Sequence, residues 1–487
     1  MAQTRREFLR NTACGTLAAT AMVRGLDKLF LVNAFAKPTD FTDYKALVCV
    51  FLFGGNDANN IVIPYTDYAQ YDAIRGQGVN LAIAQENLLQ ISPPSAGRDF
   101  GLHPALGPAG SGLHGLWGQG KVAILVNTGT LIQPITRDDY QRGIGRPYQL
   151  FSHSDQVTAY QTSYAQGHAS SGWAGRLADE VQGSQTFPVV TSINGVQMFS
   201  AGVYTKPLII GTGRLDQALT VTRNYPEIGQ LVQIEQADGS RTLVQNSANL
   251  VFNALDIMRQ LRDIGDPTIS TPFPNTGFAN QLKQVAKMIK IAPAPPPGGL
   301  GVQRQVFFVA IGGFDTHNNQ GIETGQQATL WTQMSQAMTA FYNCVDTELG
   351  LASKVTTFTM SDFSRTLKPN DPGDRVGTDH AWGGHHFVMG GAVNGGDFYG
   401  TFPRFTLGGD DDVDNGGGAR GRFLPTISVD QYAATMALWY GLDPAHLPIV
   451  FPNLSRFTQA DLGFMMPGTA PVASAERKGL VRRALGF

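Results

Sequence analysis

The sequence predicts an α/β fold in which a mainly parallel central sheet is sandwiched by helices. Four short apolar runs, rich in β-branched and aromatic residues, have the length and continuous hydrophobicity of strands buried on both faces. These runs are residues 46–53, 121–126, 305–311 and 354–360. Between them, apolar residues recur at helical spacing over 105–117, 242–262, 279–291 and 328–347. Alternation of the two patterns is typical of parallel strands connected by helices.

Composition sets limits on the domain organisation and on the partners. The chain has 487 residues, of which 42% are hydrophobic and 15% charged, against ~25% charged in an average globular protein. The formal net charge is -2 and no basic stripe is interleaved with aromatic residues, so nucleic acid and anionic membranes are not expected partners. We expect residues 37–487 to form a single domain with long loop insertions. The Pro/Gly-rich stretch 292–301 is then a surface loop and not a domain linker.

The N-terminus has the pattern of a twin-arginine signal peptide. Arg5 and Arg6 precede a weakly apolar run at 12–23, and residues 34–36 (Ala-Phe-Ala) have the small-x-small form of a cleavage site. An ordinary amphipathic helix is the alternative, but the order of these features favours export. We therefore predict a signal peptide at 1–36, recognition by the twin-arginine export machinery, and a periplasmic or secreted mature protein. No apolar run is long enough to cross a bilayer, so the mature form is expected to lack a transmembrane segment.

Polar side chains follow each predicted strand, where ligands bind in parallel α/β sheets. In strand order these residues are Asp57; Thr128, Thr130, Ser152 and His153; Asp315 and His317; and Asp362, Asp379 and His380. Each placement alone has a plain structural explanation. Asp57 could be a turn former or a helix N-cap, and the stretch 379–386 could be a solvated glycine-rich loop. Convergence from four strands in a chain poor in charge nevertheless predicts one site.

Carboxylates and imidazoles are ligands for divalent metal ions. Mixed Asp/His sets suit zinc, manganese or iron, and an all-oxygen subset could hold calcium or magnesium. We expect one or two ions, with zinc or manganese preferred and calcium as a further option. Such an ion would polarise a phosphoryl or sulfuryl oxygen. A hydroxyl group beside it would lose its proton near neutral pH and could attack.

Six motifs together carry a resemblance to a known family. They are GGND, LFSHSDQ, SGWAGRL, GGFDTHNNQ, SDFSRT and GTDHAWGGHHFVMGGAVNGG, in this order behind the twin-arginine pattern. As a set they resemble an exported bacterial family called domain of unknown function 1501, which is grouped by similarity with the alkaline phosphatase and sulfatase superfamily. The resemblance implies an alkaline-phosphatase-like sheet between helices, with a mono- or binuclear metal site at the strand ends.

The resemblance also implies roles for individual residues. The metal ligands would be Asp57, Asp315, His317, Asp362 and His380. The nucleophile would be Ser152, with Ser154 and Thr130 as lesser candidates. Phe363 stands where the superfamily usually has a histidine after the late-strand aspartate, so Asp379 and His380 could be the equivalent pair instead. The supporting residues or alternative ligands would be His153, Asp379, His385 and His386.

We therefore expect a metal-dependent hydrolase of phosphate or sulfate esters, with a small-molecule or glycan ester as substrate. The alternative is a non-catalytic exported binding or assembly protein that has the same fold and a degenerate site. Phe363 and the weakly matched nucleophile motif favour this alternative. In that case the polar stretch 133–171 would be a recognition surface.

Overall fold

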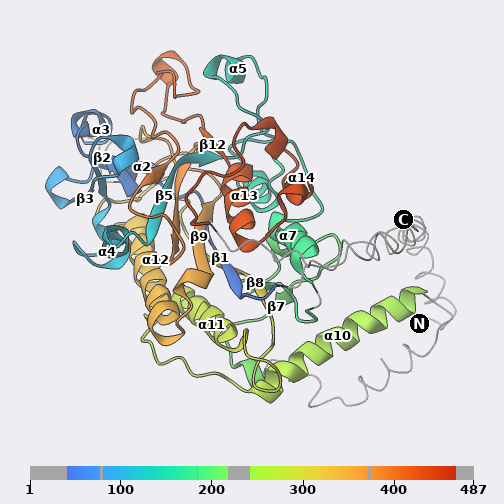
Figure 1. Ribbon diagram of the computed structural model, residues 1–487. Helices are drawn as coiled ribbons and strands as arrows, with labels where there is room; N and C mark the ends of the chain where they lie inside the picture. The colour runs from blue at the N-terminus through green and yellow to red at the C-terminus, as the bar shows by residue number, and fades with distance from the viewer. Residues whose placement is uncertain (1–40, 77–79, 184, 218–241, 371–374, 468–487) are drawn as a thin grey trace, which may run out of the picture.

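The structure, a computed structural model, describes residues 41–76, 80–183, 185–217, 242–370 and 375–467 (Figure 1). The predicted signal peptide at 1–36 lies outside these residues. None of the helices in the described part of the chain is long and apolar enough to cross a membrane.

A large sheet forms the centre of the described chain. Its strands are β1 (Lys45–Phe53), β5 (Val122–Gly129), β6 (Val190–Ser192), β7 (Leu208–Ile209), β8 (Arg304–Gly312), β9 (Val355–Ser361), β10 (Gly384–Gly390), β11 (Phe398–Tyr399) and β12 (Ile427–Ser428). The order is β11-β5-β10-β9-β1-β8-β6-β7, and β12 pairs with β5. β1 is parallel to β8 and β9, whereas β10 is antiparallel to β9 and β5. The predicted α/β fold with a mostly parallel sheet is confirmed.

Burial on both faces explains why the strand sequences are continuously apolar. Successive side chains of a strand point to opposite faces of the sheet. In β1, Val48 and Val50 pack into the core on one face, and Cys49 and Phe51 pack into the core on the other. A fully buried large apolar side chain contributes ~1.5–3 kcal/mol to stability, so replacing any of these four side chains by a polar residue should destabilise the fold.

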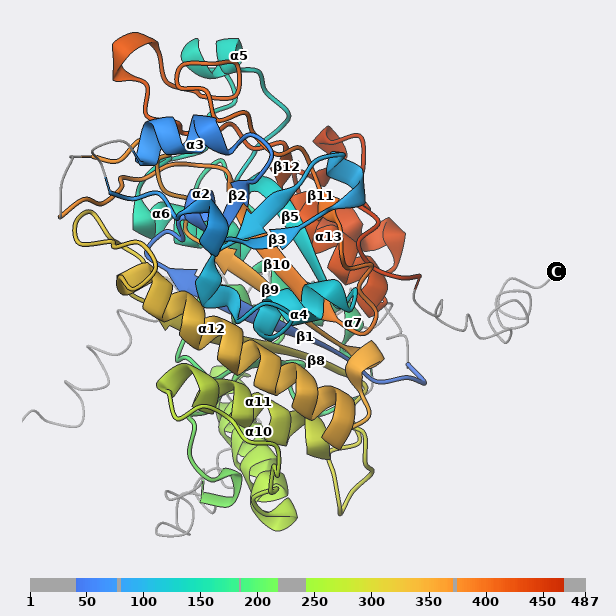
Figure 2. The same ribbon diagram turned by 90° about the vertical axis from the view of Figure 1, so that its left-hand side faces the viewer.

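Helices cover both faces. The first face is covered by α4 (Gly112–Gly118), α11 (Gly277–Ile291) and α12 (Gln326–Asn343), and the second by α7 (Trp173–Val181), α13 (Val429–Tyr440) and α14 (Leu447–Val450). Figure 2 shows α12 crossing in front of the sheet with α11 beneath it. Further helices are α2 (Ala58–Ile61), α3 (Tyr68–Arg75), α5 (Arg137–Gln141), α6 (His153–Thr162) and α10 (Thr242–Ile264). A small antiparallel sheet contains β2 (Val62–Pro64), β3 (Leu89–Ile91) and β4 (Phe100–Leu102).

The predicted helices exist, with shifted ends in some cases. The pattern at 105–117 is helical only over α4, because glycines and Pro108 interrupt its first half. The stretch 292–301 connects α11 to β8. The polar stretch 133–171 contains α5 and α6. Of these two helices, α6 contributes to the site. It places His153 at its first turn, above the carboxyl end of the sheet, where the polar residues gather.

Candidate metal centre

Three loops at the carboxyl ends of β1, β8 and β9 meet in one place. They approach closely because Gly54 has a φ of 112° and no side chain, and a Cβ there would lie 2.4 Å from the backbone nitrogen of Asp315. Any other residue would push the loops after β1 and β8 apart. The Gly54 N–H also donates to the Asp362 carboxylate at 3.1 Å, which ties the loop after β1 to the end of β9.

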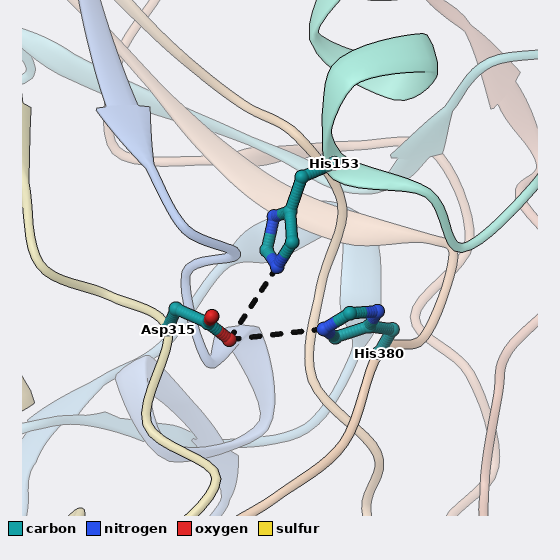
Figure 3. A group of neighbouring side chains, drawn as sticks. All are labelled: His153, Asp315 and His380. Carbon is teal, nitrogen blue, oxygen red and sulfur yellow. Dashed lines mark ion pairs between the residues drawn. The ribbon is translucent and has the colours of Figure 1, made fainter.

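Asp315 lies at the centre of a group of three histidines. Its Oδ1 is 3.1 Å from Nε2 of His317, 3.4 Å from Nε2 of His153 and 3.7 Å from Nε2 of His380. Figure 3 shows His153 and His380 pointing their rings at Asp315 from two different segments. The Nε2 atoms of His317 and His380 are 3.0 Å apart. We call these four residues the His₃Asp group.

The other ring nitrogen of each histidine is held by an acceptor. Nδ1 of His153 lies 2.7 Å from the Asp362 carboxylate, Nδ1 of His317 lies 2.9 Å from the Asp379 carboxylate, and Nδ1 of His380 lies 2.7 Å from the Phe151 carbonyl oxygen. Carboxylates and carbonyls only accept hydrogen bonds, so each Nδ1 carries the proton and donates. The Nε2 atoms of His317 and His380 then present lone pairs to each other, and all three Nε2 atoms present lone pairs to Asp315. Nε2 of His153 is buried without a hydrogen-bond partner.

Burial and neighbouring charges shift the pKa values of the ionisable side chains in the site. The hydrogen bond to Asp362 raises the pKa of His153, although burial opposes this. Burial lowers the pKa of His380. Burial also disfavours the charge on Asp315, but Arg365 and the histidines outweigh it and hold the pKa of that carboxyl below its usual range. Asp315 is therefore ionised and His380 neutral near pH 7, which suits both for binding a cation.

Asp57, predicted as a ligand, does not join the His₃Asp group. Its carboxylate is fully buried and paired with Arg75, whose Nη1 and Nη2 lie 2.6 and 3.0 Å from the two oxygens. Gln320 donates to one oxygen at 2.6 Å, and the backbone N–H of Asn59 donates to the other at 3.2 Å. Both oxygens are used, so Asp57 acts as the N-cap of α2 and as the counter-ion of Arg75.

Asp362 and His153 have exchanged their predicted roles. Asp362 was expected to be a ligand, but it is buried behind His153 and orients that ring. His153, expected in a supporting place, points its Nε2 into the group. Asp379 supports His317 in the same way, and it is itself paired with Arg420 at 2.6 Å. The order of these residues along the chain does not reveal which of them faces inward.

His385 and His386 do not belong to the site. They lie in β10 and are buried, and burial lowers the pKa of each to about 3. His385 Nδ1 accepts from the Asn127 backbone N–H at 3.0 Å, and His386 contacts the Tyr160 hydroxyl at 3.3 Å. Both are neutral core residues.

The hydroxyl candidates differ in accessibility. Ser152 is the N-cap of α6, directly before His153, and its Oγ donates to the Asp155 carboxylate at 2.6 Å. Ser154 is exposed. Thr130 is buried and donates to Gln156 at 2.6 Å, which leaves it unavailable. Ser152 and Ser154 both flank His153 in sequence, and Ser152 makes the shorter hydrogen bond to Asp155, at 2.6 Å against 3.4 Å for Ser154.

Sequence reasoning missed Arg75, Arg365 and the packing of Phe363. Arg365 is buried and its Nη1 lies 3.1 Å from Asp315 Oδ1. The ring centroid of Phe363 lies 4.7 Å from that of His153 and 4.6 Å from that of His380. No signal in the sequence distinguished these arginines from surface arginines, because their partners come from distant segments.

Comparisons with known proteins bear on the later half of the chain. Residues 300–447 match a family described as "Protein of unknown function (DUF1501)", so the resemblance inferred from the motifs is confirmed over these residues. Among solved structures, two substituted forms of TAB5 alkaline phosphatase with Mg bound in the M3 site are similar at 9% identity. They cover 71% of this chain and 90% of their own, with TM-scores of 0.21 and 0.20, which carry no argument about function. No curated protein matches the chain significantly.

Proposed function

We propose that the chain is an exported, metal-dependent hydrolase of phosphate or sulfate esters. The observation that carries the proposal is the convergence of three imidazole lone pairs and one carboxylate oxygen in the His₃Asp group. The motif resemblance supports a relation to the alkaline phosphatase and sulfatase superfamily. The arginine pair and the following apolar run support export by the twin-arginine machinery to the periplasm or the medium.

The group lacks positive charge at its centre. The Nε2 lone pairs of His317 and His380 face each other, and an ionised carboxylate lies beside all three Nε2 atoms, so these groups repel unless a proton or a metal cation lies between them. Arg365 offsets part of the charge of Asp315 but contacts none of the Nε2 atoms within hydrogen-bond distance. Metal-binding histidines in general donate their second ring N–H to a carboxylate or a carbonyl, which is the arrangement of all three histidines here.

The separations also fit a first-row divalent cation. Zinc lies ~2.0–2.1 Å from imidazole nitrogen and carboxylate oxygen, so the ligand atoms of a tetrahedral site are ~3.3 Å apart. Four of the six distances among the ligand atoms of the group are 3.0, 3.1, 3.4 and 3.7 Å. Three imidazoles and one carboxylate favour zinc or manganese over calcium, which prefers oxygen ligands. His153, Asp315 and His380, whose ligand atoms all lie within 4.8 Å of one another, would hold the ion, and His317 would add a ligand from the side of Asp315 and His380.

A bound divalent ion supplies Lewis-acid polarisation of a phosphoryl or sulfuryl oxygen. The chain's own residues would orient the rings and handle the proton. As Ser152 Oγ attacks phosphorus or sulfur, Asp155 can accept its proton and pass it to the departing alcohol. Water then hydrolyses the ester formed on Ser152. The substrate class would be a small-molecule or glycan ester.

Two measurements test this function. Metal content is determined by mass spectrometry on protein purified after native export, and release of phosphate and sulfate is followed on a panel of aryl and sugar esters. Ser152→Ala should lower turnover by at least ~10²-fold, whereas the exposed neighbour Ser154→Ala, the matched control, should change it less than ~3-fold. A metal-free protein that is inert on every ester would contradict the proposal.

A non-catalytic exported binding or assembly protein is the second candidate. Two observations favour it: Phe363 replaces an expected histidine, and Asp57 is used by Arg75. The variant Asp315→Ala separates the two candidates. Loss of both metal and turnover fits the enzyme, while unchanged folding and partner binding without metal or turnover fits the binding protein.

A further inference from the structure

Three further aspartates lie at the same strand ends outside the His₃Asp group, and all three are already used by other side chains. Both oxygens of Asp57 are bound, chiefly by Arg75. Asp362 accepts from His153 and from the Gly54 N–H, and Asp379 is shared between His317 and Arg420. Asp315 is the carboxylate that faces the three Nε2 atoms, and its side chain is 47% exposed.

Two buried arginines stand beside these carboxylates as fixed cations. Arg75 donates to the carbonyls of Thr366 and Leu367, each at 2.8 Å, in addition to Asp57. Arg365 donates to the Thr378 carbonyl at 2.7 Å and to Asp315. Both guanidinium groups are fully buried and held from several sides. They cannot swing away to release a carboxylate without leaving a buried charge unpaired.

Phe363 covers the side of the group formed by His153 and His380. Its ring packs against the rings of His153 and His380, and the left-handed Gly55 gives it room, because a Cβ on Gly55 would lie 2.7 Å from it. An apolar ring offers no ligand atom. Two divalent ions ~3.5–4 Å apart need several carboxylates to offset their charge, and among the residues that the structure describes one carboxylate of the group is available, that of Asp315, which is already shared with Arg365.

We infer that the centre holds a single divalent ion, because Arg75, Arg365 and Phe363 occupy the surroundings where ligands for a second ion would have to be. The inference rests on the proposed metal centre and fixes its stoichiometry. Arg75 and Arg365 are positioning residues: they replace a second metal ion as the positive charge that holds Asp57 and Asp315 in place.

Metal stoichiometry tests the inference on the full mature chain. The chain is stripped with a chelator and titrated with zinc chloride and with manganese chloride, and content is measured by mass spectrometry and calorimetry. We expect one ion per chain and an uncoupled electron paramagnetic resonance spectrum with manganese. Two ions per chain, or a spin-coupled manganese spectrum, would overturn the inference and leave the metal centre standing. No uptake at all would overturn both.

A matched set of variants adds a second readout. The double variant Asp57→Asn, Arg75→Gln removes both buried charges together, and it should still bind one ion with a Kd within ~3-fold of the unmodified chain. Asp315→Asn should raise the Kd by at least 100-fold. If the double variant loses its ion as Asp315→Asn does, Asp57 is a ligand and the inference is wrong. If circular dichroism shows that the double variant does not fold, the number of ions bound per unmodified chain still tests the inference.

Discussion

The segment that contains His380, His385 and His386 presents histidines in two different settings. His380 is partly exposed, its Nδ1 donates to a carbonyl, and its Nε2 faces other acceptors. His385 and His386 are buried in β10, and the His386 ring stacks on Tyr432 at 10° between the ring planes. Each of them also has one ring nitrogen without a hydrogen-bond partner, and no carboxylate of the described residues pairs with it.

The difference shows that histidine content alone does not make a site. What distinguishes His380 is that its free lone pair meets the lone pairs of two other histidines and the oxygen of Asp315, so that the cluster is short of positive charge. The buried pair is stabilised by being neutral among aromatic rings. The same residue type therefore supports a centre that needs a cation in one place and a core that excludes charge in the other.

Replacing a histidine of the centre should have the largest effect. His380→Ala removes a ligand atom and should weaken zinc binding by at least ~100-fold, since a three-ligand remainder would also lose the Phe151 anchor. Calorimetric titration measures the Kd. A Kd within ~3-fold of the value for the unmodified chain would show that His380, like its buried neighbours, is not a metal ligand.

Replacing Asp362, the carboxylate behind His153, should weaken metal binding less than replacing a ligand does, but by a measurable factor. Asp362→Asn keeps the size of the side chain and removes the charge that orients Nδ1. Loss of such an orienting partner costs ~10–100-fold in metal affinity. Circular dichroism controls for folding, because Asp362 also accepts from Gly54. An affinity equal to that of the unmodified chain would mean that the ring is fixed by packing against Phe363 alone.

The buried histidines His385 and His386 should make the free energy of unfolding depend on pH. With a folded pKa of about 3 for His386 and ~6.5 in the unfolded chain, protons bind to the unfolded state in the window between these values. The free energy of unfolding should therefore fall as pH drops below ~6.5, by ~2 kcal/mol per buried histidine between pH 7 and 5.

Denaturant unfolding of His386→Gln at pH 7 and pH 5 checks this dependence. The variant should lose less stability on acidification than the unmodified chain, by the contribution of one histidine. An identical pH dependence would show that His386 is not the group responsible.

The smallest effect is expected at the surface. His446 is partly exposed and pairs with Glu180 at 2.8 Å, and exposed pairs contribute ~0–1 kcal/mol. His446→Ala should leave the Kd for zinc unchanged and alter the free energy of unfolding by less than ~1 kcal/mol. A loss of metal in this variant would mean that histidines outside the centre contribute to the measured binding.

The central strands of the fold were predictable because their sequences are apolar on both faces. β1, β5, β8 and β9 begin and end within three residues of the predicted runs. β10 is not among the four predicted runs, since two adjacent histidines interrupt its apolar pattern. Its antiparallel direction depends on pairing with β5 and β9, which local sequence does not encode.

The site was predictable at the level of segments and not of individual contacts. Strand-end placement identified Asp315, His317 and His380 correctly as neighbours, because the carboxyl ends of parallel strands meet. The capture of Asp57 by Arg75 depends on α3 folding back over the loop after β1. The exchange of roles between Asp362 and His153 depends on the position of the first turn of α6. Both are tertiary relations that no spacing along the chain reveals.

Anomalous diffraction from crystals grown with zinc or manganese salts would test the central claim most directly. We expect one strong anomalous peak, bounded by Nε2 of His153, His317 and His380 and by a carboxylate oxygen of Asp315. An empty centre in metal-loaded crystals, or a peak whose ligands include Asp57 or Asp362, would contradict it.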